Sequence, residues 1–322
     1  LCPYIGGTNH SDPVSEFILL GFTCTWAMQI FLFSLFSVMY VLTLIGNLCI
    51  TCTVWWDQHL HTPMYILLAN FSFLEMWYAT STVPSMLANF LSETKTISFS
   101  GCFLQFYFFF SVGITEDFLS AMASDRYLAI CRPLHYPTVM TVQRCIRMGA
   151  CCWVCGFSCF LFPVYLISQL PFCLPYCGPN VINHFMCDPV PLMMLSCSED
   201  TTTQFIYSTF NSIFMTGTFL FILCSYALVI LAVLRMPWAA SKRKAFSTCA
   251  SHLAVVILFF GSVMVMYVSP GSEHPVEMQK LVTLFYSVIT PLCNPLIYSL
   301  RNKEMKAALK KVFGSEISVQ KT

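Results

Sequence analysis

Acidic residues inside long apolar stretches are the first candidates for chemistry in this sequence. Glu75 interrupts the apolar residues 63–88, and Glu116 and Asp117 interrupt residues 96–131. A charged side chain at the middle of a bilayer costs about 2.5–3.5 kcal/mol on insertion scales, so each acid is expected to have a role. Asp117 faces about 100° away from Glu116 on a helix and cannot share its site. We expect it to bond a neighbouring helix or stay protonated, with binding of an amine ligand as the alternative.

The adjacent charges of Asp125 and Arg126 are the second candidate. They stand at the end of an apolar stretch, and an arginine so close to a bilayer needs a partner. Asp125 can be that partner in a resting state, which gives a charge pair able to open. A static anchoring pair is the alternative.

Residue sets for catalysis are missing from the sequence. It contains neither His-Glu-x-x-His nor Gly-x-Ser-x-Gly, and His252 is the one histidine expected within a membrane span. Two cysteine pairs at CxxC spacing lie in apolar stretches, whereas redox and zinc sites need polar, accessible surroundings. We therefore expect packing cysteines there and no enzymatic activity.

The composition explains why these few polar residues stand out. The chain has 322 residues, of which 57% are hydrophobic and 10% are charged, with a mean hydropathy of +0.70. Ordinary globular domains carry roughly 25% charged residues. So few charges cannot cover a water-soluble surface, which excludes a soluble enzyme and a nucleic-acid-binding protein.

The apolar stretches are long enough to cross a membrane, which takes ~20 residues of helix. The prediction is an all-α membrane protein, a seven-transmembrane helix bundle over residues 28–299. Residues 1–27 form an extracellular tail, and residues 300–322 form a cytoplasmic amphipathic helix and tail. The predicted spans are about 28–54, 63–88, 97–131, 147–168, 203–235, 245–268 and 278–299.

The basic residues predict the orientation of these spans. Of the 16 Lys and Arg residues, only Lys95 and Lys280 fall on one side of the predicted membrane. Basic residues are concentrated on the cytoplasmic side, so the N-terminus lies outside. Asn9-His10-Ser11 is then an N-glycosylation sequon on the extracellular side.

The long outer loop between the fourth and fifth spans predicts disulfides, because exposed cysteines in an oxidising compartment pair readily. Cys102, at the outer start of the third span, is the natural partner for one of the loop cysteines. Free thiols are the alternative. The loop cysteines are Cys173, Cys177, Cys187 and Cys197.

Four motifs stand in order at the predicted cytoplasmic ends of the helices. They are LHTPMY at 60–65, MASDRYLAIC at 122–131, KAFSTCASHL at 244–253 and PLCNPLIYS at 291–299. Gly46-Asn47 and Ser225-Tyr226 accompany them. Together these motifs resemble those of the olfactory receptors, within the rhodopsin-like (class A) G-protein-coupled receptors, and the resemblance covers essentially the whole chain.

The resemblance implies an odorant receptor in the plasma membrane of olfactory sensory neuron cilia. Such a receptor binds small hydrophobic volatile ligands and activates a stimulatory G protein of the olfactory type, which raises cAMP. A non-olfactory class A receptor for a small ligand is one alternative. A membrane transporter is another, but it would predict internal repeats.

The resemblance also assigns roles in activation. When the sixth helix moves outward, Arg126 is freed to contact the G protein, with Tyr226 and Tyr298 moving in beneath it. Pro295 interrupts the hydrogen bonds of the seventh helix, and Asn47 and Asn294 can bridge the freed groups. The residues assigned to coupling are Asp125, Arg126, Tyr127, Tyr226, Lys244, His252, Asn294, Pro295 and Tyr298.

The outer halves of the helices supply a candidate ligand pocket. Apolar residues at helical spacing are by default packing residues, but an aromatic pocket with few polar anchors also suits small hydrophobic volatiles. The candidate lining residues are Phe109, Phe110, Gly113, Ile114, Phe210, Asn211, Phe214, Met264, Tyr267 and Ser287.

The family places acids at matching positions around an inner sodium or polar network. We expect Glu75 and Glu116 to share a Na⁺ ion, or one of them to be protonated because two close carboxylates raise a pKa. No other cofactor is expected. By family spacing, Cys102 pairs with Cys187 and Cys177 pairs with Cys197, which leaves Cys173 as the odd thiol.

Two local departures from the family pattern could impair function. The third helix is one residue shorter than expected between Cys102 and Asp125, which rotates one half by about 100° against the other unless a kink absorbs it. Residues 170–177 look like a duplicated tetrapeptide.

After the seventh span, residues 302–313 predict a short amphipathic helix on the membrane surface, with lipid as a partner; a solvated tail is the alternative. Its apolar face would carry Met305, Leu309, Val312 and Phe313, and its lysines are Lys303, Lys306, Lys310 and Lys311.

Overall fold

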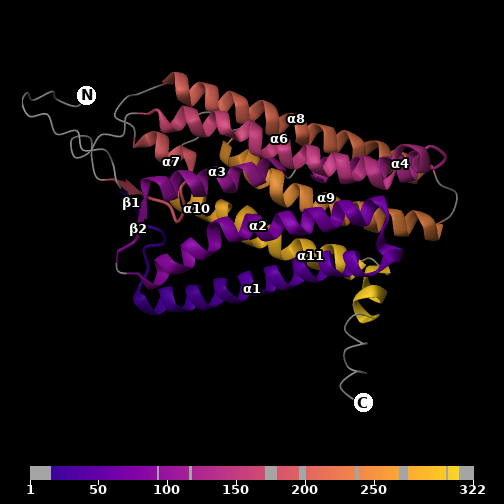
Figure 1. Cartoon of the computed structure of the whole chain (residues 1–322), viewed down its shortest axis with the longest axis horizontal. Coiled ribbons are helices and arrows are strands. Elements are labelled where there is room, and N and C mark those ends of the chain that lie inside the picture. The colour runs from indigo at the N-terminus through magenta and orange to yellow at the C-terminus, as the bar shows by residue number, and fades with distance from the viewer. Residues whose placement is uncertain are drawn as a thin grey trace, which may run out of the picture.

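Seven long helical segments lie side by side along one axis in the described part of the chain (Figure 1). The structure, a computed structural model, describes residues 16–92, 94–115, 118–170, 180–195, 201–235, 239–267, 275–301 and 304–311. Strand β1 lies at one end of the bundle and the end of α11 at the other (Figure 1). This arrangement agrees with a chain that begins outside a membrane and ends inside.

The bounds of the helices follow the predicted spans and extend beyond most of them. The third segment consists of α3 and α4, and the seventh of α10, the π-helical turn η2 and α11. The seven segments are α1 (Trp26–Trp56), α2 (Pro63–Leu91), α3 (Phe99–Thr115) with α4 (Phe118–Cys131), α6 (Val142–Ser168), α8 (Thr201–Leu234), α9 (Ala239–Tyr267), and α10 (Val276–Leu284) with η2 (Phe285–Ile289) and α11 (Thr290–Arg301). Short helices join them: η1 (Gln58–Leu60), α5 (Tyr136–Val139) and α7 (Pro189–Met194).

Helix ends beyond the apolar stretches are set by polar capping. Helix α6 begins at Val142, ahead of the predicted residue 147, and the Thr141 side chain accepts a hydrogen bond from the backbone N–H of Arg144. Such a cap satisfies one of the free donors of the first turn. An apolar run marks only the part of a helix inside the membrane, so it cannot predict this polar first turn.

Hydropathy alone identifies five of the segments as long and apolar enough to cross a membrane, among the described residues. Helix α2 contains the buried acid Glu75, and the apolar part of α9 is the shorter His252–Met266. Large apolar side chains are exposed along α1, among them Phe31, Leu42 and Leu48. Exposed apolar surface of this kind is compatible with lipid rather than water.

A small sheet lies at the end of the bundle that carries the N-terminal strand (Figure 1). No pattern in the sequence indicated this sheet. Its strands are β1 (Glu16–Leu19), β2 (Thr96–Ser98) and β3 (Val181–Ile182), in the order β2-β1-β3. Strand β1 is antiparallel to β2 and parallel to β3. The sheet therefore ties the start of the chain to two outer loops.

The helices pack in pairs, α1 on α2, α3 on α6, α4 on α8 and α8 on α9. The α3–α6 contact is especially close at Gly156. A Cβ atom at that position would clash with the Thr115 hydroxyl group and lie 2.7 Å from the backbone oxygen of Ser111. Small residues allow helix backbones to approach in this way.

Gly156→Ala should therefore destabilise the receptor. The added methyl group meets backbone, which cannot turn aside, and overpacking of this kind costs typically 1–3 kcal/mol. Thermal unfolding of the purified receptor measures the effect. Gly217→Ala in α8 is the matched control, because a Cβ atom there meets nothing within 4 Å. Equal melting temperatures for the two variants would contradict the close α3–α6 contact.

Candidate functional site

A small cavity lies between the helices in their outer halves. Its volume is about 20 Å³, enough for about one water molecule. Four of the predicted pocket residues, Phe110, Gly113, Ile114 and Asn211, line it. The remaining lining residues come from α2, α6, α8, α9 and η2: Tyr78, Phe160, Met215, Phe259, Val263 and Tyr286.

The other predicted pocket residues do not line this cavity. Phe109 is buried and stacks on Tyr78 with ring centroids 4.5 Å apart. Phe210 and Phe214 stack on each other at 6.4 Å. The Ser287 hydroxyl donates to the backbone oxygen of Thr283 at 2.6 Å. Met264 is partly buried, and the side chain of Tyr267 lies outside the described part.

Three lining residues were missed by a single position. Met215, Val263 and Tyr286 line the cavity, and each is a chain neighbour of a residue that was predicted to do so. One residue on a helix corresponds to a rotation of about 100°. Helices that are apolar on nearly every side have no polar face to define their rotation, so the sequence carried little signal for this choice.

Aromatic contacts form the walls of the cavity. Phe110 stacks on Phe160 at 5.4 Å, and Phe259 meets the edge of Tyr78 at 6.2 Å. Polar groups are few. The Tyr286 hydroxyl donates to Thr283 Oγ1 at 3.2 Å, and Asn211 adds an amide. The cavity is suited to an apolar ligand that makes few hydrogen bonds.

A buried polar network lies within the bundle around Glu75. Asn294 Nδ2 donates a hydrogen bond to Glu75 Oε1, and both side chains are almost fully buried. Each of these two side chains also carries a buried oxygen atom without a hydrogen-bond partner among the described residues, Glu75 Oε2 and Asn294 Oδ1. Oxygen ligands suit hard cations. Glu116 and Asp117, the other predicted acids, lie outside the described residues.

Pro295 shapes the seventh helix at its contact with α1. A proline lacks the N–H that would bond the carbonyl group four residues earlier, here that of Pro291. Asn47 Nδ2 donates to the Pro291 oxygen at 3.1 Å. A Cβ atom at Gly46 would lie 3.1 Å from Pro295 Cγ, so the glycine admits the proline ring.

The structure gives Asp125 a different partner from the predicted Arg126. The Tyr136 hydroxyl, in α5, donates to Asp125 Oδ1 at 2.8 Å. Among the described residues no ion pair joins Asp125 to Arg126. Burial of the Tyr136 hydroxyl raises the pKa of Tyr136, and the Asp125 carboxylate raises it further. A hydroxyl group from the following loop therefore satisfies the acid, which sequence adjacency could not indicate.

Arg126 acts electrostatically on Asp125 and also on residues of α8 and α9. Its charge acts on both Tyr226 and His252, whose rings are 6.4 Å apart. Arg126 Nε is buried without a hydrogen-bond partner in the described part of the structure. Tyr127 is partly buried, and the side chains of Lys244 and Tyr298 are outside the described part. Three of the predicted coupling residues are thus brought together.

Cys102 and Cys187 form a disulfide with their Cα atoms 5.5 Å apart. Gln105 Oε1 accepts a hydrogen bond from the Cys187 backbone N–H at 3.1 Å, and Gln105 Nε2 donates to the Ser81 oxygen at 3.2 Å. This fixes the outer loop over α2 and α3. Cys173, Cys177, Cys197 and the Asn9 sequon lie outside the described residues, as does the duplicated segment from residue 171 onward.

Residues 304–311 are helical at the opposite end of the molecule. The Tyr65 hydroxyl donates to Glu304 Oε2 at 2.7 Å, while Met305 and Ala308 are buried against the bundle. The lysines of this helix are exposed, and Lys311 lies 4.0 Å from the Asp57 carboxylate. Val312 and Phe313 lie outside the described part.

A cluster of three or more His, Cys, Asp or Glu side chains suited to a metal ion is absent from the described residues.

The sequence comparisons agree with the motifs. The family model described as "Olfactory receptor" matches residues 36–316. Human olfactory receptor 11G2 is 61% identical over 308 residues, which cover 95% of this chain and 88% of that protein. Human olfactory receptor 11H12 is 57% identical over 326 residues, with 98% and 99% coverage. Human olfactory receptor 11H6 is 61% identical over 306 residues, with 95% and 92% coverage. A family match over most of the chain and relatives at this identity confirm the resemblance: the chain belongs to the olfactory receptor family.

Proposed function

We propose that this receptor binds small hydrophobic odorants in the cavity of its outer half and activates an olfactory-type stimulatory G protein, which raises cAMP. The observation that carries the proposal is the apolar, aromatic cavity shared by α2, α3, α6, α8, α9 and η2. As a member of the family, the protein is a multi-pass signalling receptor of the plasma membrane, not an enzyme.

The size of the cavity suggests how a ligand would act. Ligand sites for drug-sized molecules measure roughly 300–1,000 Å³, far more than the 20 Å³ of this cavity. An odorant must therefore displace lining side chains. Phe259 and Val263 belong to α9, so a ligand that pushes on them also pushes on that helix.

Helix α9 connects the cavity with the coupling end. His252 lies seven residues before Phe259, about 10 Å along the axis at 1.5 Å per residue. His252 is near Arg126 and Tyr226, so movement of α9 would change the surroundings of Arg126. Ligand binding can shift the receptor in this way only by favouring the moved state.

A cAMP assay with an odorant panel tests both ends of this mechanism. Arg126→Ala should reduce the odorant response to the level of untransfected cells, because the proposed contact with the G protein is lost. Gly113→Ala should weaken the response at least severalfold, because its methyl group occupies part of the cavity while making ordinary contact, 3.8 Å, with Tyr78.

Arg147→Ala is the matched control for the charge, since Arg147 is exposed on α6. Surface staining separates loss of signalling from loss of receptor. A full response from Arg126→Ala at equal surface level would exclude the coupling role, and an unchanged response from Gly113→Ala would exclude the cavity.

We also propose that the Glu75 network binds Na⁺ in the resting receptor. The partnerless oxygens of the hydrogen-bonded pair Glu75 and Asn294 support this. When bound, the ion would supply a positive charge that offsets the buried carboxylate. Glu116, the second predicted ligand of the Na⁺ ion, lies outside the described residues. Its part in the site therefore stays a prediction from the sequence.

Glu75→Gln should remove the effect of sodium on the receptor. An ion that favours the resting state lowers odorant potency, by about fivefold for a typical coupling of two sites. Odorant dose–response curves in sodium and in choline at equal ionic strength measure this effect. Potency in wild type that is independent of sodium would refute the ion site, and a Glu75→Gln receptor as sensitive as wild type would remove Glu75 from it.

A further inference from the structure

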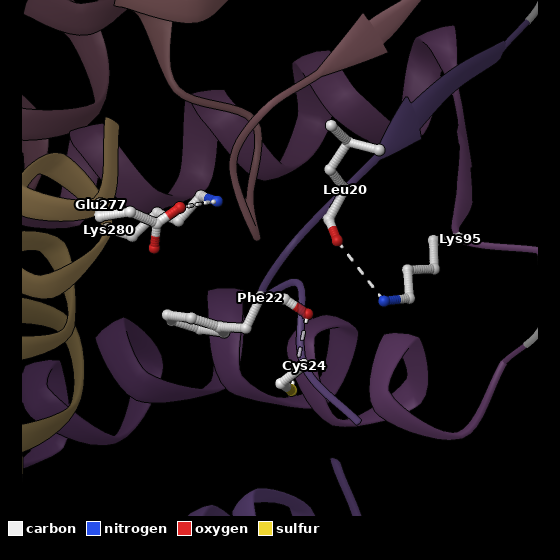
Figure 2. A network of polar contacts seen from close by, with 6 residues as sticks. All are labelled: Leu20, Phe22, Cys24, Lys95, Glu277 and Lys280. Carbon is white, nitrogen blue, oxygen red and sulfur yellow. Dashed lines mark hydrogen bonds and ion pairs between the residues drawn. The ribbon is translucent and has the colours of Figure 1, made fainter. Parts of the chain in front are cut away.

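Lys280 is a buried cation at the outer end of the seventh helical segment. Its side chain is 1% exposed, and its ammonium group lies 3.1 Å from Glu277 Oε1 (Figure 2). The Glu277 side chain is 72% exposed. An ammonium group has three donors, and this contact uses one. Two buried N–H groups of Lys280 therefore lack an acceptor among the described residues.

His184, in the outer loop after β3, supplies another free donor. Its Nδ1 accepts a hydrogen bond from the Met186 backbone N–H at 3.3 Å. Burial, followed by the charge of Lys280, lowers the pKa of His184 from 6.5 to about 3, so the ring is neutral. In a neutral imidazole one nitrogen accepts and the other donates. The proton is consequently on Nε2, which has no partner in the described part of the structure.

Lys280 and His184 both have N–H donors that lack a hydrogen-bond acceptor among the described residues. Lys280 and His184 are both buried, they interact electrostatically, and both present N–H donors without an acceptor. A buried donor left without a partner is unfavourable, because it has lost its hydrogen bonds to water. The chemical group that would satisfy both is a hydrogen-bond acceptor, and the lysine charge favours an oxygen that carries negative charge or a strong dipole.

A row of buried side chains leads from Lys280 to the aromatic cavity. Lys280, Thr283 and Tyr286 follow at intervals of three residues and are all buried, so each side chain lies beside the next along the helix. Tyr286 lines the cavity and bonds Thr283. Six residues of helix separate Lys280 from Tyr286, a rise of about 9 Å.

We propose that Lys280 and His184 form an acceptor-binding subsite that selects odorants carrying a carbonyl or carboxylate oxygen. The oxygen end would bind these two donors, and the apolar chain would extend along Thr283 to the aromatic cavity. Lys280 and His184 are thus specificity-determining residues. This inference rests on the proposed odorant-binding function and adds the chemical class of the ligand.

The test compares matched ligands in the cAMP assay. Medium-chain aldehydes, ketones and carboxylates are paired with terminal alkenes of equal length, and full dose–response curves are recorded. Lys280→Met keeps the length of the side chain and removes the donors. It should raise the half-maximal concentration of the oxygen-bearing ligands about 10- to 100-fold, the range for hydrogen bonds to charged groups. The alkenes should be unaffected.

Three further variants make the comparison specific. His184→Phe keeps the ring contact with Phe185, 4.6 Å between centroids, and removes Nε2–H; it should shift the same ligands. Lys280→Arg restores charge and should recover part of the potency. Lys95→Met is the control, because this outer lysine donates to the Leu20 backbone oxygen at 3.4 Å instead (Figure 2).

The outcomes separate the two proposals. If no ligand of any class activates the wild-type receptor, the odorant-binding function is overturned and the inference falls with it. If Lys280→Met shifts alkenes and oxygen-bearing ligands equally, or shifts neither, only the subsite is overturned. A free anion could supply the same acceptor. If alkene potency depends on chloride in wild type but not in Lys280→Met, a free anion supplies the acceptor. That result would overturn selection by the odorant's own oxygen.

Discussion

The hydrogen bond from Asn294 to Glu75 is the contact on which the arrangement of the inner bundle depends. A carboxyl group within an apolar bundle is costly unless a partner lies beside it, and this partner joins α2 to α11. Three residues before Asn294, the carbonyl group of Pro291 is left free by Pro295, and Asn47 of α1 donates a hydrogen bond to it. Helices α1, α2 and α11 are therefore held together by hydrogen bonds between polar groups that have no water to bond within the membrane.

Each end of the molecule keeps a buried polar atom without a hydrogen-bond partner among the described residues, Arg126 Nε at the inner end and His184 Nε2 at the outer end. At the inner end, Tyr136 binds Asp125 and leaves Arg126 beside α8 and α9. At the outer end, the disulfide and the small sheet fix the loops, yet His184 retains a buried donor without a partner among the described residues. Buried polar groups are usually bonded, so both exceptions are consistent with places that receive a partner, a G protein at the inner end and a ligand at the outer end.

Much of the fold followed from the sequence, whereas the site followed only in part. The long apolar runs and the sided basic residues predicted the bundle and its orientation, because the length of a span and the position of charge are local properties. The lining of the cavity required the rotation of each helix about its own axis. Met215, Val263 and Tyr286 were missed by one residue, since an apolar helix in lipid carries no polar stripe to define that rotation.

The sequence by itself determined the family and the seven spans, and it predicted their direction and the residues that would couple to a G protein. The tertiary structure decided which of those residues meet. It placed Tyr136 on Asp125, joined the N-terminal strand to two loops, and brought His184 of a loop near Lys280 of a helix. These contacts join residues from different elements, and hydrogen bonds and charges act over a few ångströms of space regardless of separation along the chain.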